Sequence, residues 1–266
     1  MQPDRSLTDI HCHLLPGIDD GADDWETALA MARMAVAEGV RAIIATPHQL
    51  GCYARNRGEA IRSRVVRMQQ ELDRHGIPLR VLPGADVRIE PGLLDQIQRG
   101  DVLSLGDCRR HVLLELPHDL YLPLDRLLDE LHVAGLVGIL SHPERNRGIL
   151  QRPNLVRQLV ERGCLMQLTA GSLTGAFGHT VRRYSEKLIE DGLVHVVASD
   201  AHDLDRRSPR LVDAFQAVAV RTDQATAIDL FCRNPASIAA GERVQSGPRR
   251  TVVRRWPFAS WFSRAS

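Results

Sequence analysis

Two histidines near the N-terminus have the residue type and spacing of a pair of metal ligands. His11 and His13 are separated by a single residue. In an extended backbone the side chains of residues i and i+2 point to the same face, so both imidazoles can reach one ion. Such pairs are common on surfaces and in cores without a metal. The pair therefore predicts a metal site only in combination with further ligands.

Two carboxylates, Asp19 and Asp20, follow the histidine pair on a short turn. Both are expected to lie close to the pair. Aspartate is also a residue type that forms Asx turns and caps helices. We expect Asp19 to have this capping role for a helix that begins near Asp24.

Other side chains that bind metals follow later apolar segments, each near the end of its segment. These side chains are His48, Asp86, Glu115, His142, Asp200 and His202. Glu115 interrupts an apolar run, and a buried carboxylate without a partner costs roughly several kcal/mol, so it needs a cation or a structural salt bridge. Asp200 and His202 repeat the i, i+2 spacing. The coincidence of several such segment ends favours one metal cluster over separate structural roles.

Short apolar runs that alternate with longer amphipathic runs must position these residues. Strands are predicted at residues 7–10, 41–46, 79–83, 111–116, 136–140, 164–168 and 193–198. Helices are predicted at residues 25–38, 59–75, 91–99, 122–134, 154–162 and 180–191, and around 209–220 and 225–232. Because parallel strands need crossover connections, this alternation predicts an α/β fold with a mainly parallel sheet.

The placement of the polar residues favours a closed or nearly closed barrel. Polar residues at the carboxyl ends of many successive strands are typical of a barrel active site. An open doubly wound sheet gathers them mainly at one switch point instead. The sequence contains neither GxGxxG after its first strand nor a P-loop, which argues against nucleotide-binding folds.

The donor set predicts the chemistry of the cluster. Imidazole and carboxylate without thiolate suit Zn²⁺, Mn²⁺ or Fe²⁺, and the number of ligands indicates two or three ions. Paired ions of this kind activate water and stabilise both oxygens of an in-line displacement. Arg145 and Arg207 are the predicted bidentate partners of phosphate oxygens. Their alternative role is pairing with a nearby acid such as Glu144 or Asp205.

Bulk properties indicate a soluble, cytoplasmic globular protein. The 266 residues are 44% hydrophobic and 25% charged, with a formal net charge of +1. A net charge this close to zero gives no long-range electrostatic attraction to nucleic acid. The five cysteines are scattered without a CxxC pair, and neither a signal peptide nor a membrane-spanning run is recognised. We predict a catalytic barrel at residues 1–246.

The remaining residues, 247–266, form a predicted C-terminal tail of different character. Four arginines precede two tryptophans and two phenylalanines. The simpler interpretation is a mobile tail, or one that packs onto the barrel through its aromatic residues. The alternative is a peripheral contact with anionic lipid or with a partner protein.

Taken in order, the motifs of this sequence resemble the polymerase-and-histidinol-phosphatase (PHP) superfamily. They are DIHCHLLPGIDDG at residues 9–21, ATPH at 45–48, SHPERN at 141–146 and SDAH at 199–202. Within the superfamily the chain is most similar to the manganese-dependent protein-tyrosine phosphatases of capsule and exopolysaccharide loci, the CpsB/CapC type. LPGIDDG, SHPERN and the GSLTGAFG stretch at 171–178 are much more specific to this branch than HxH or DxH.

The resemblance implies a distorted (β/α)7 TIM-like barrel with three metal ions. Mn²⁺ is the implied metal, with Fe²⁺, Zn²⁺ or Mg²⁺ as alternatives. The implied ligands are His11, His13, Asp20, His48, Glu115, His142, Asp200 and His202, and Arg145 and Arg207 match the phosphate-holding arginines. The implied substrate is phosphotyrosine on a bacterial tyrosine autokinase that controls polysaccharide synthesis, hydrolysed by attack of a metal-bridging hydroxide.

This chain departs from the branch at two positions. The third strand of the branch usually ends Gly-x-Glu with a metal-bridging glutamate, whereas here Gly84 and Ala85 precede Asp86. Aspartate is one methylene shorter than glutamate. We therefore expect either that it still bridges two metals, one of them shifted, or that it binds on one side only. After the sixth strand the branch often has Gln-Ile-Asn, and here Gln167, Leu168 and Thr169 leave the amide contact open.

Three other functions remain open at this point. The same ligands serve phosphatases of sugar phosphates or histidinol phosphate. A metal-dependent nuclease is a second alternative, disfavoured by the near-neutral charge and the lack of a basic stripe. The third is a catalytically weak regulator that binds the kinase tail, for which Asp86 is the only indication.

Overall fold

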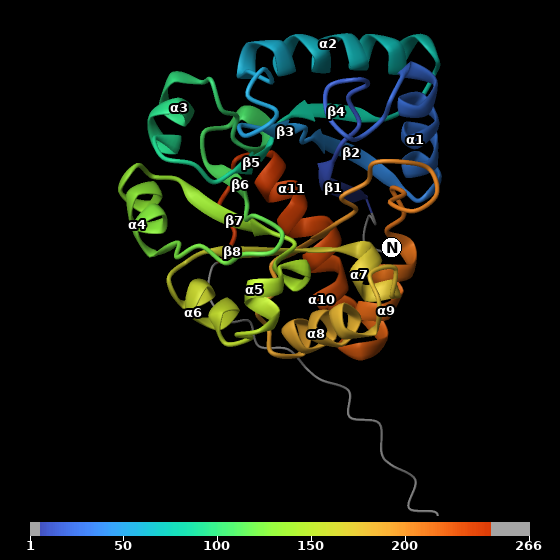
Figure 1. Ribbon diagram of the computed structural model, residues 1–266. Coiled ribbons are helices and arrows are strands. Elements are labelled where there is room, and N and C mark those ends of the chain that lie inside the picture. The colour runs from blue at the N-terminus through green and yellow to red at the C-terminus, as the bar shows by residue number, and fades with distance from the viewer. Residues whose placement is uncertain (1–5, 246–266) are drawn as a thin grey trace, which may run out of the picture.

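The computed structural model describes residues 6–245, and within them all strands pair in parallel. The strands are β1 (Leu7–Cys12), β2 (Val40–Ala45), β3 (His48–Gln49), β4 (Arg80–Pro83), β5 (Asp86–Arg88), β6 (His111–Glu115), β7 (Val137–Ser141), β8 (Leu165–Thr169) and β9 (Val196–Ala198). They form a three-stranded sheet, β1-β2-β4, and a six-stranded sheet, β3-β5-β6-β7-β8-β9 (Figure 1). The predicted parallel α/β fold is confirmed.

Two short interruptions between consecutive strands and one isolated bridge join the two sheets into a barrel-like ring. On one side, β2 continues into β3 across Pro47, which has no N–H to donate to a ladder, and β4 continues into β5 across Gly84. A Cβ at Gly84 would lie 2.5 Å from Ile44 Cγ2, so this close approach requires glycine. On the other side, Cys12 forms an isolated parallel bridge with Ala201, just beyond β9.

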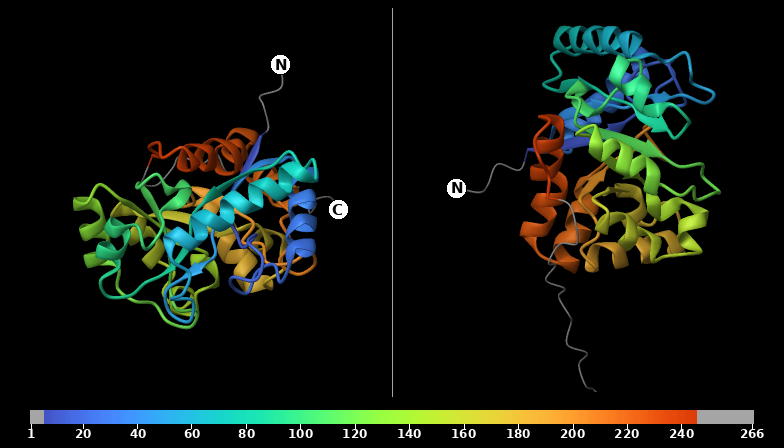
Figure 2. Two further views of the ribbon diagram at one scale, coloured as in Figure 1. Left: turned by 90° about the horizontal axis from the view of Figure 1, so that it is seen from above. Right: turned by 90° about the vertical axis from the view of Figure 1, so that its left-hand side faces the viewer.

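Helices cover the outside of this ring (Figure 1). They are α1 (Trp25–Ala37), α2 (Gly58–Arg74), α3 (Leu93–Arg99), α4 (Asp125–Val133), α5 (Arg147–Leu150), α6 (Leu155–Glu161), α7 (Ala170–Thr174), α8 (His179–Glu190), α9 (Val212–Arg221), α10 (Gln224–Ile228) and α11 (Asn234–Ala239). Short η1 (Leu105–Asp107), η2 (Pro143–Arg145) and η3 (Asp229–Arg233) complete the chain. The C-terminal helices lie together on one side of the molecule (Figure 2).

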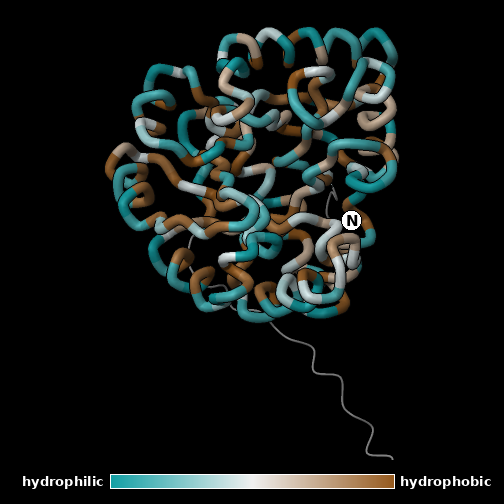
Figure 3. Tube along the Cα trace, viewed as in Figure 1, coloured by the Kyte–Doolittle hydropathy of each residue, from teal (hydrophilic) through white to brown (hydrophobic). Residues whose placement is uncertain are grey.

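The barrel interior is filled by one apolar side chain from most strands. Ile10, Ile44, Leu113, Ile139 and Leu165 are all fully buried in one cluster. Burying such a side chain contributes about 1.5–3 kcal/mol. The apolar residues lie along the strands in the middle of the molecule, and polar residues mark the outer turns (Figure 3).

Helix α11 closes the amino-terminal end of the ring. Its Ile238 belongs to the interior cluster, together with Leu105 of η1. At the start of α11, Asn234 Nδ2 donates a hydrogen bond of 2.7 Å to the carbonyl of His195, directly before β9. Because apolar residues cover this end, a polar site can form only at the other end, where the carboxyl ends of the strands lie.

All seven predicted strands are present, and their observed ends differ by at most three residues from the predicted ones. The eight predicted helices are present as well, the last of them continuing as η3. The short strands β3 and β5 and the short helices α5, α7 and α11 were not predicted. The predicted tail at 247–266 lies outside the described residues. Among the described helices, none combines the length and the apolar character that crossing a membrane requires.

Candidate metal centre

The predicted ligands come together at the carboxyl ends of the strands. His11 lies in β1 and His13 just after it, His48 and Asp86 begin β3 and β5, Glu115 ends β6, His142 follows β7, and Asp200 and His202 follow β9. Asp20 reaches the same place from the loop before α1. Their donor atoms form three neighbouring groups.

The first group contains His11, His13, Asp86 and Asp200. His11 Nε2 lies 3.3 Å from His13 Nε2, 3.2 Å from Asp200 Oδ1 and 3.4 Å from Asp86 Oδ2. His13 Nε2 lies 3.7 Å from Asp200 Oδ1. All four side chains are almost completely buried. Two imidazole nitrogens and two carboxylate oxygens therefore converge on one point.

The second group shares Asp86 with the first. His142 Nε2 lies 3.9 Å from Asp86 Oδ2 and 3.8 Å from Glu115 Oε1. The same Asp86 Oδ2 is the atom that lies 3.4 Å from His11 Nε2. A single carboxylate oxygen therefore faces both groups, which is the placement of a bridging ligand.

The third group is nearer to the surface. Asp20 Oδ1 lies 3.3 Å from His48 Nε2 and 3.5 Å from His202 Nε2. The other nitrogen of His48, Nδ1, lies 3.4 Å from Glu115 Oε2 and so connects this group to the second. Half of the Asp20 side chain, 51%, is exposed, whereas His202 is buried. This group is the most open of the three.

The spacing and the unmade hydrogen bonds of these groups fit divalent ions. Ligand atoms that surround one ion at about 2.1 Å lie ~3.0–3.4 Å apart in octahedral or tetrahedral geometry. Asp86 Oδ1, Asp86 Oδ2 and His202 Nε2 are buried without a hydrogen-bond partner. Leaving such atoms unpaired costs several kcal/mol, roughly, unless a cation binds them. The residues present therefore fit a cluster of two or three ions.

Neighbouring side chains fix the orientation of the two histidines on β1. Asp19 Oδ2 accepts a hydrogen bond of 2.7 Å from His13 Nδ1, and Gln167 Oε1 accepts one of 2.9 Å from His11 Nδ1. Both bonds turn Nε2 toward the first group, as hydrogen-bonded partners of metal ligands do. Of the Gln-Ile-Asn pattern, the Gln167 amide is thus in contact with His11, whereas Thr169 has no amide to offer.

The Asx turn predicted at Asp19 is present, because Gly21 N donates to its Oδ1, but the predicted helix-capping role is wrong. The cap of α1 is Asp24 itself, whose Oδ1 accepts a hydrogen bond of 2.8 Å from Thr27 N. Asp19 instead accepts bonds from Gly21 N and His48 N, at 3.0 Å each, besides the bond from His13. The turn therefore aims this carboxylate back at the histidine pair, which the local sequence pattern of a capped helix did not show.

Replacing Asp19 with Asn is expected to weaken Mn²⁺ binding by about 10- to 100-fold, since losing a charged partner of a ligating histidine has effects of this size. Asparagine keeps the volume and one acceptor, so folding is preserved. Titration calorimetry with Mn²⁺ measures the Kd. Asp23→Asn, at an exposed position in the same turn, is the matched control. Equal affinities in the two variants would show that Asp19 has no role in metal binding.

Mutual electrostatics set the protonation of the cluster before any ion binds. Burial acts to lower the pKa of His11, but Asp200 and Asp86 raise it to about 9. Burial likewise acts to lower the pKa of His48, but the neighbouring acids Asp20, Asp86 and Glu115 raise it to about 10. Protons thus occupy positions that a cation takes when it binds.

His13 and Glu115 are shifted toward their neutral forms. Burial and the neighbouring His202 lower the pKa of His13 to about 4. Burial and the nearby Asp86 raise the pKa of Glu115 to about 7. Burial also opposes ionisation of Asp86, yet His11 and His142 hold its pKa well below the usual range. Excess negative charge in the cluster is therefore relieved by protons, as a cation would relieve it.

Both predicted phosphate-binding arginines lie at the edge of the first group. Arg145 Nη2 and Arg207 Nη2 lie 2.5 and 2.7 Å from Asp200 Oδ2, while Asp200 Oδ1 faces His11. The alternative pairings, with Glu144 or Asp205, are not the ones found for these guanidinium groups. Instead, buried Glu144 accepts hydrogen bonds from Thr169 N and Ser172 Oγ and holds η2 against α7.

Two aromatic side chains at the site were not predicted. The Arg145 guanidinium lies over the Phe177 ring, 4.6 Å from its centroid. Tyr53 stacks on the His48 ring with centroids 5.2 Å apart and an interplanar angle of 23°. Phe177 belongs to the GSLTGAFG stretch that carries the family resemblance, which is a usable signal. No sequence pattern singled out Tyr53.

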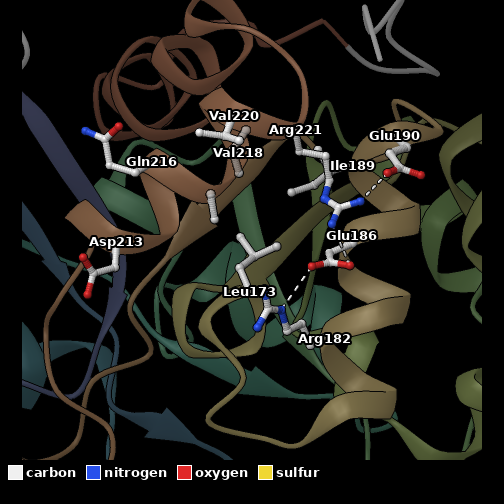
Figure 4. A pocket seen from close by; sticks show the side chains of 11 residues that line it. Leu173, Arg182, Glu186, Ile189, Glu190, Asp213, Gln216, Val218, Val220 and Arg221 are labelled. Atoms are coloured by element: carbon white, nitrogen blue, oxygen red, sulfur yellow. Dashed lines mark hydrogen bonds and ion pairs between the residues drawn. The ribbon is translucent and has the colours of Figure 1, made fainter. Parts of the chain in front are cut away.

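The larger hollows of the described residues lie away from these ligands. One, of about 640 Å³, lies between α8 and α9, where Arg182, Glu186 and Arg221 form a ladder of ion pairs (Figure 4). Two of its three acidic groups, Glu186 and Glu190, are paired with arginines, and none of the three metal-ligand groups reaches it. Its chemistry therefore differs from that of the metal centre.

Comparison with known proteins agrees with this geometry. The family model described as "Capsular polysaccharide synthesis, CpsB/CapC" matches residues 7–240. The tyrosine-protein phosphatase YwqE of Bacillus subtilis is 41% identical over 204 residues, which are 76% of this chain and 80% of YwqE. The putative tyrosine-protein phosphatase CapC of Staphylococcus aureus is 29% identical over 257 residues, covering 96% of this chain and 99% of CapC.

Solved structures give the same result. A crystal structure from the pair YwqE of Bacillus subtilis and CpsB of Streptococcus pneumoniae, described as unique metal-dependent tyrosine phosphatases, superposes with a TM-score of 0.88. It is 35% identical and covers 93% of this chain and 100% of its own. A phosphotriesterase homology protein of Escherichia coli superposes with a TM-score of 0.54 at 12% identity, which shows a shared fold alone.

Proposed function

Since this chain belongs to the CpsB/CapC family, we propose that it is a metal-dependent phosphatase that hydrolyses phosphotyrosine in a protein substrate. The observation that carries the proposal is the Asp86 oxygen shared by two ligand groups, one of which also contains Asp200, the residue that holds both arginines. The metal ligands and the proposed phosphate-binding arginines thus meet at the carboxylate of Asp200.

The three ligand groups give the proposed ion sites. His11, His13, Asp86 and Asp200 hold the first ion, Asp86, Glu115 and His142 the second, and Asp20, His48 and His202 the third. Mn²⁺ is the proposed metal, because carboxylates and imidazoles are mixed in each group. Bound ions supply Lewis acidity and an activated water for in-line displacement at phosphorus. The half-exposed third site is expected to bind its ion least tightly.

Arg145 and Arg207 are proposed to bind and orient the phosphate. Their guanidinium groups are held by one oxygen of Asp200, and this ion pair keeps both in place before substrate arrives. Planar guanidinium groups bind phosphate oxygens bidentately. The face of Phe177 supports Arg145 from the other side and restricts its motion. Positioning of the phosphate is therefore largely set in advance.

The leaving group explains why tyrosine esters suit this site. Phenol has a pKa of ~10, so phenolate departs without help from a strong general acid. Alkyl esters such as phosphoserine leave as far more basic alkoxides. No side chain in the described part of the site is a clear proton donor once its histidines are committed to ions. Phosphotyrosine is accordingly the substrate class that the residues favour.

The natural substrate is proposed to be a tyrosine autokinase that controls capsule or exopolysaccharide synthesis. Support comes from the family, which is defined by capsular polysaccharide synthesis, and from relatives named as tyrosine-protein phosphatases. The five cysteines are all free thiols, which supports the cytoplasm as the place of action.

The proposal is tested by stripping the protein with a chelator and restoring single metals. Turnover of a phosphotyrosyl peptide is expected to vanish with the metal and to return best with Mn²⁺. Blocking the thiols with iodoacetamide is expected to leave turnover unchanged. Activity that survives the chelator but not alkylation would overturn the metal mechanism. A higher kcat/KM for histidinol phosphate or a sugar phosphate would assign the chain to small-molecule hydrolysis instead.

A further inference from the structure

A small cavity of about 180 Å³ lies beside the phosphate-binding arginines, between the loops that follow β8 and β9. Thr169 and Phe177 line one side of it, and Arg206, Arg207 and Arg210 line the other. Two aspartates, Asp205 and Asp213, complete the charged lining, so three arginines against two aspartates leave a formal charge of +1. A cavity of this size and charge suits one small monoanionic group.

The cavity is directly continuous with the proposed phosphate site through two residues. Arg207 lines the cavity and also reaches Asp200 Oδ2, at 2.7 Å. Phe177 lines the cavity and also lies under the guanidinium group of Arg145. The cavity and the proposed phosphate site are therefore adjacent, with Arg207 and Phe177 shared between them. A substrate that places its phosphate at the arginines can reach the cavity with a neighbouring side chain.

The arginine side of the cavity is held rigidly. Asp203 Oδ1 accepts hydrogen bonds from the backbone N–H groups of Asp205, Arg206 and Arg207, at 2.7, 2.7 and 3.0 Å. The loop is tied back again by a bond of 2.8 Å from His202 N to the carbonyl of Arg207. A preformed loop loses little conformational entropy when it binds a ligand. The backbone that carries Arg206 and Arg207 is thus held in place, while Arg210 lies further along the chain with its Nη1 3.9 Å from Glu38 Oε1.

Unused polar atoms at the cavity wall point to a ligand. Thr169 is 2% exposed, and its Oγ1 has no hydrogen-bond partner. Arg207 Nε, on the opposite wall, is likewise buried without a partner. Buried donors of this kind are normally satisfied. A hydroxyl and a guanidinium N–H that face one small space are complementary to an oxygen anion.

We propose that this cavity is a subsite for the carboxylate of an acidic side chain that neighbours the phosphotyrosine in the substrate protein. The inference rests on the proposed function and adds to it a preference for acidic sequence around the target tyrosine. A carboxylate matches the single net positive charge, whereas a dianionic phosphate would be opposed by Asp205 and Asp213. Arg206 and Arg210, both exposed, are the residues that attract it.

The test compares pairs of phosphotyrosyl peptides that differ only by Glu or Gln, placed one or two residues before or after the phosphotyrosine. The Mn²⁺-loaded protein is expected to show a kcat/KM about three- to tenfold higher for Glu than for Gln at one or more positions, the range of partly exposed charge-assisted bonds. The double variant Arg206→Gln/Arg210→Gln is expected to bring this ratio to about one. Each ratio is taken on a single preparation, so losses in folding cancel.

Arg55→Gln is the matched control, because Arg55 is an exposed arginine on a different loop, after β3. It is expected to keep the ratio of the unmodified protein. A ratio near one at every position in the unmodified protein, or a ratio that survives the double change, would overturn the subsite. So would an equal loss in Arg55→Gln, which would indicate general charge attraction.

The same peptides with a non-hydrolysable phosphonate in place of the phosphate give the ratio as a Kd. This measurement separates the subsite from the proposed function. Absence of turnover with a Kd ratio of three or more would refute the phosphatase activity and keep the acidic subsite. Turnover of all peptides with Kd ratios near one would refute the subsite alone.

Discussion

Replacing Asp86 with Asn is expected to lower kcat for a phosphotyrosyl peptide on the order of a thousandfold, because it removes the charge that two ion sites share. Asp86 Oδ2 faces His11 at 3.4 Å and His142 at 3.9 Å, and both oxygens are buried without a hydrogen-bond partner. Asparagine offers one neutral oxygen there. Metal analysis of the purified variant is expected to show at least one ion fewer per chain.

The variant Asp86→Glu tests whether the shorter aspartate side chain supports full activity or weakens the metal site. Asp86 is fully buried and pairs in register with His48 across β3 and β5, so an added methylene must be absorbed within the cluster. We expect activity within about tenfold of the unmodified protein. A gain of a hundredfold or more would show that the aspartate weakens the site and would favour a regulatory role. Unchanged activity in Asp86→Asn would contradict the bridging placement itself.

Replacing Arg145 with Ala is expected to lower kcat/KM for the phosphotyrosyl peptide by about 100- to 1,000-fold with the ion content unchanged. Electrostatic stabilisation by a single preorganised donor has this magnitude. The Arg145 side chain is only 9% exposed and is held by Asp200 and Phe177. Steady-state kinetics with metal analysis of the same sample measure both quantities.

Two further variants make the result for Arg145 specific. Arg145→Lys keeps the charge but loses bidentate geometry, so it is expected to recover only part of the activity. Arg147→Ala, two residues along the chain, removes an arginine whose ion pair with Asp119 is 70% exposed on both sides, and it is expected to be near neutral. Loss of ions in Arg145→Ala would instead give the arginine a structural role in the cluster.

The shared carboxylate of Asp200 gives the two predictions a common physical basis. One of its oxygens faces His11 and the other holds both arginines. Burial alone opposes its ionisation, but His11, Arg145 and Arg207 hold its pKa well below the usual range. Asp200 therefore stays negatively charged, with His11 next to one oxygen and the two arginines next to the other. The metal centre and the phosphate site are coupled through one side chain.

Most of the fold followed from the sequence because its signals are local. Apolar runs of strand length alternate with amphipathic runs of helical length, and this alternation by itself requires parallel strands with crossovers. The position of each His, Asp or Glu after an apolar run then placed the ligands at one end of the barrel. What the pattern missed were very short elements such as β3, β5 and α7, whose lengths carry no periodicity.

Backbone strain at the site was also beyond a sequence prediction. His142 and Asp200 adopt left-handed backbone conformations, with φ of 34° and 53°. Such conformations cost of order 1–3 kcal/mol for residues with a Cβ and persist only where surrounding contacts impose them. Here the bonds from Asp200 N to the His11 carbonyl and from His13 N to the Ala201 carbonyl, both 2.8 Å, hold the turn after β9.

The sequence alone determined which residue types lie at which strand ends, because each motif directly follows an apolar run of strand length. Only the tertiary structure decided how they are shared: that Asp86 faces two groups, that Asp19 orients His13 instead of capping a helix, and that Asp200 joins ions to arginines. These relations depend on distances between segments as far as 190 residues apart. Such distances are fixed by barrel packing and strand register, which local sequence does not encode.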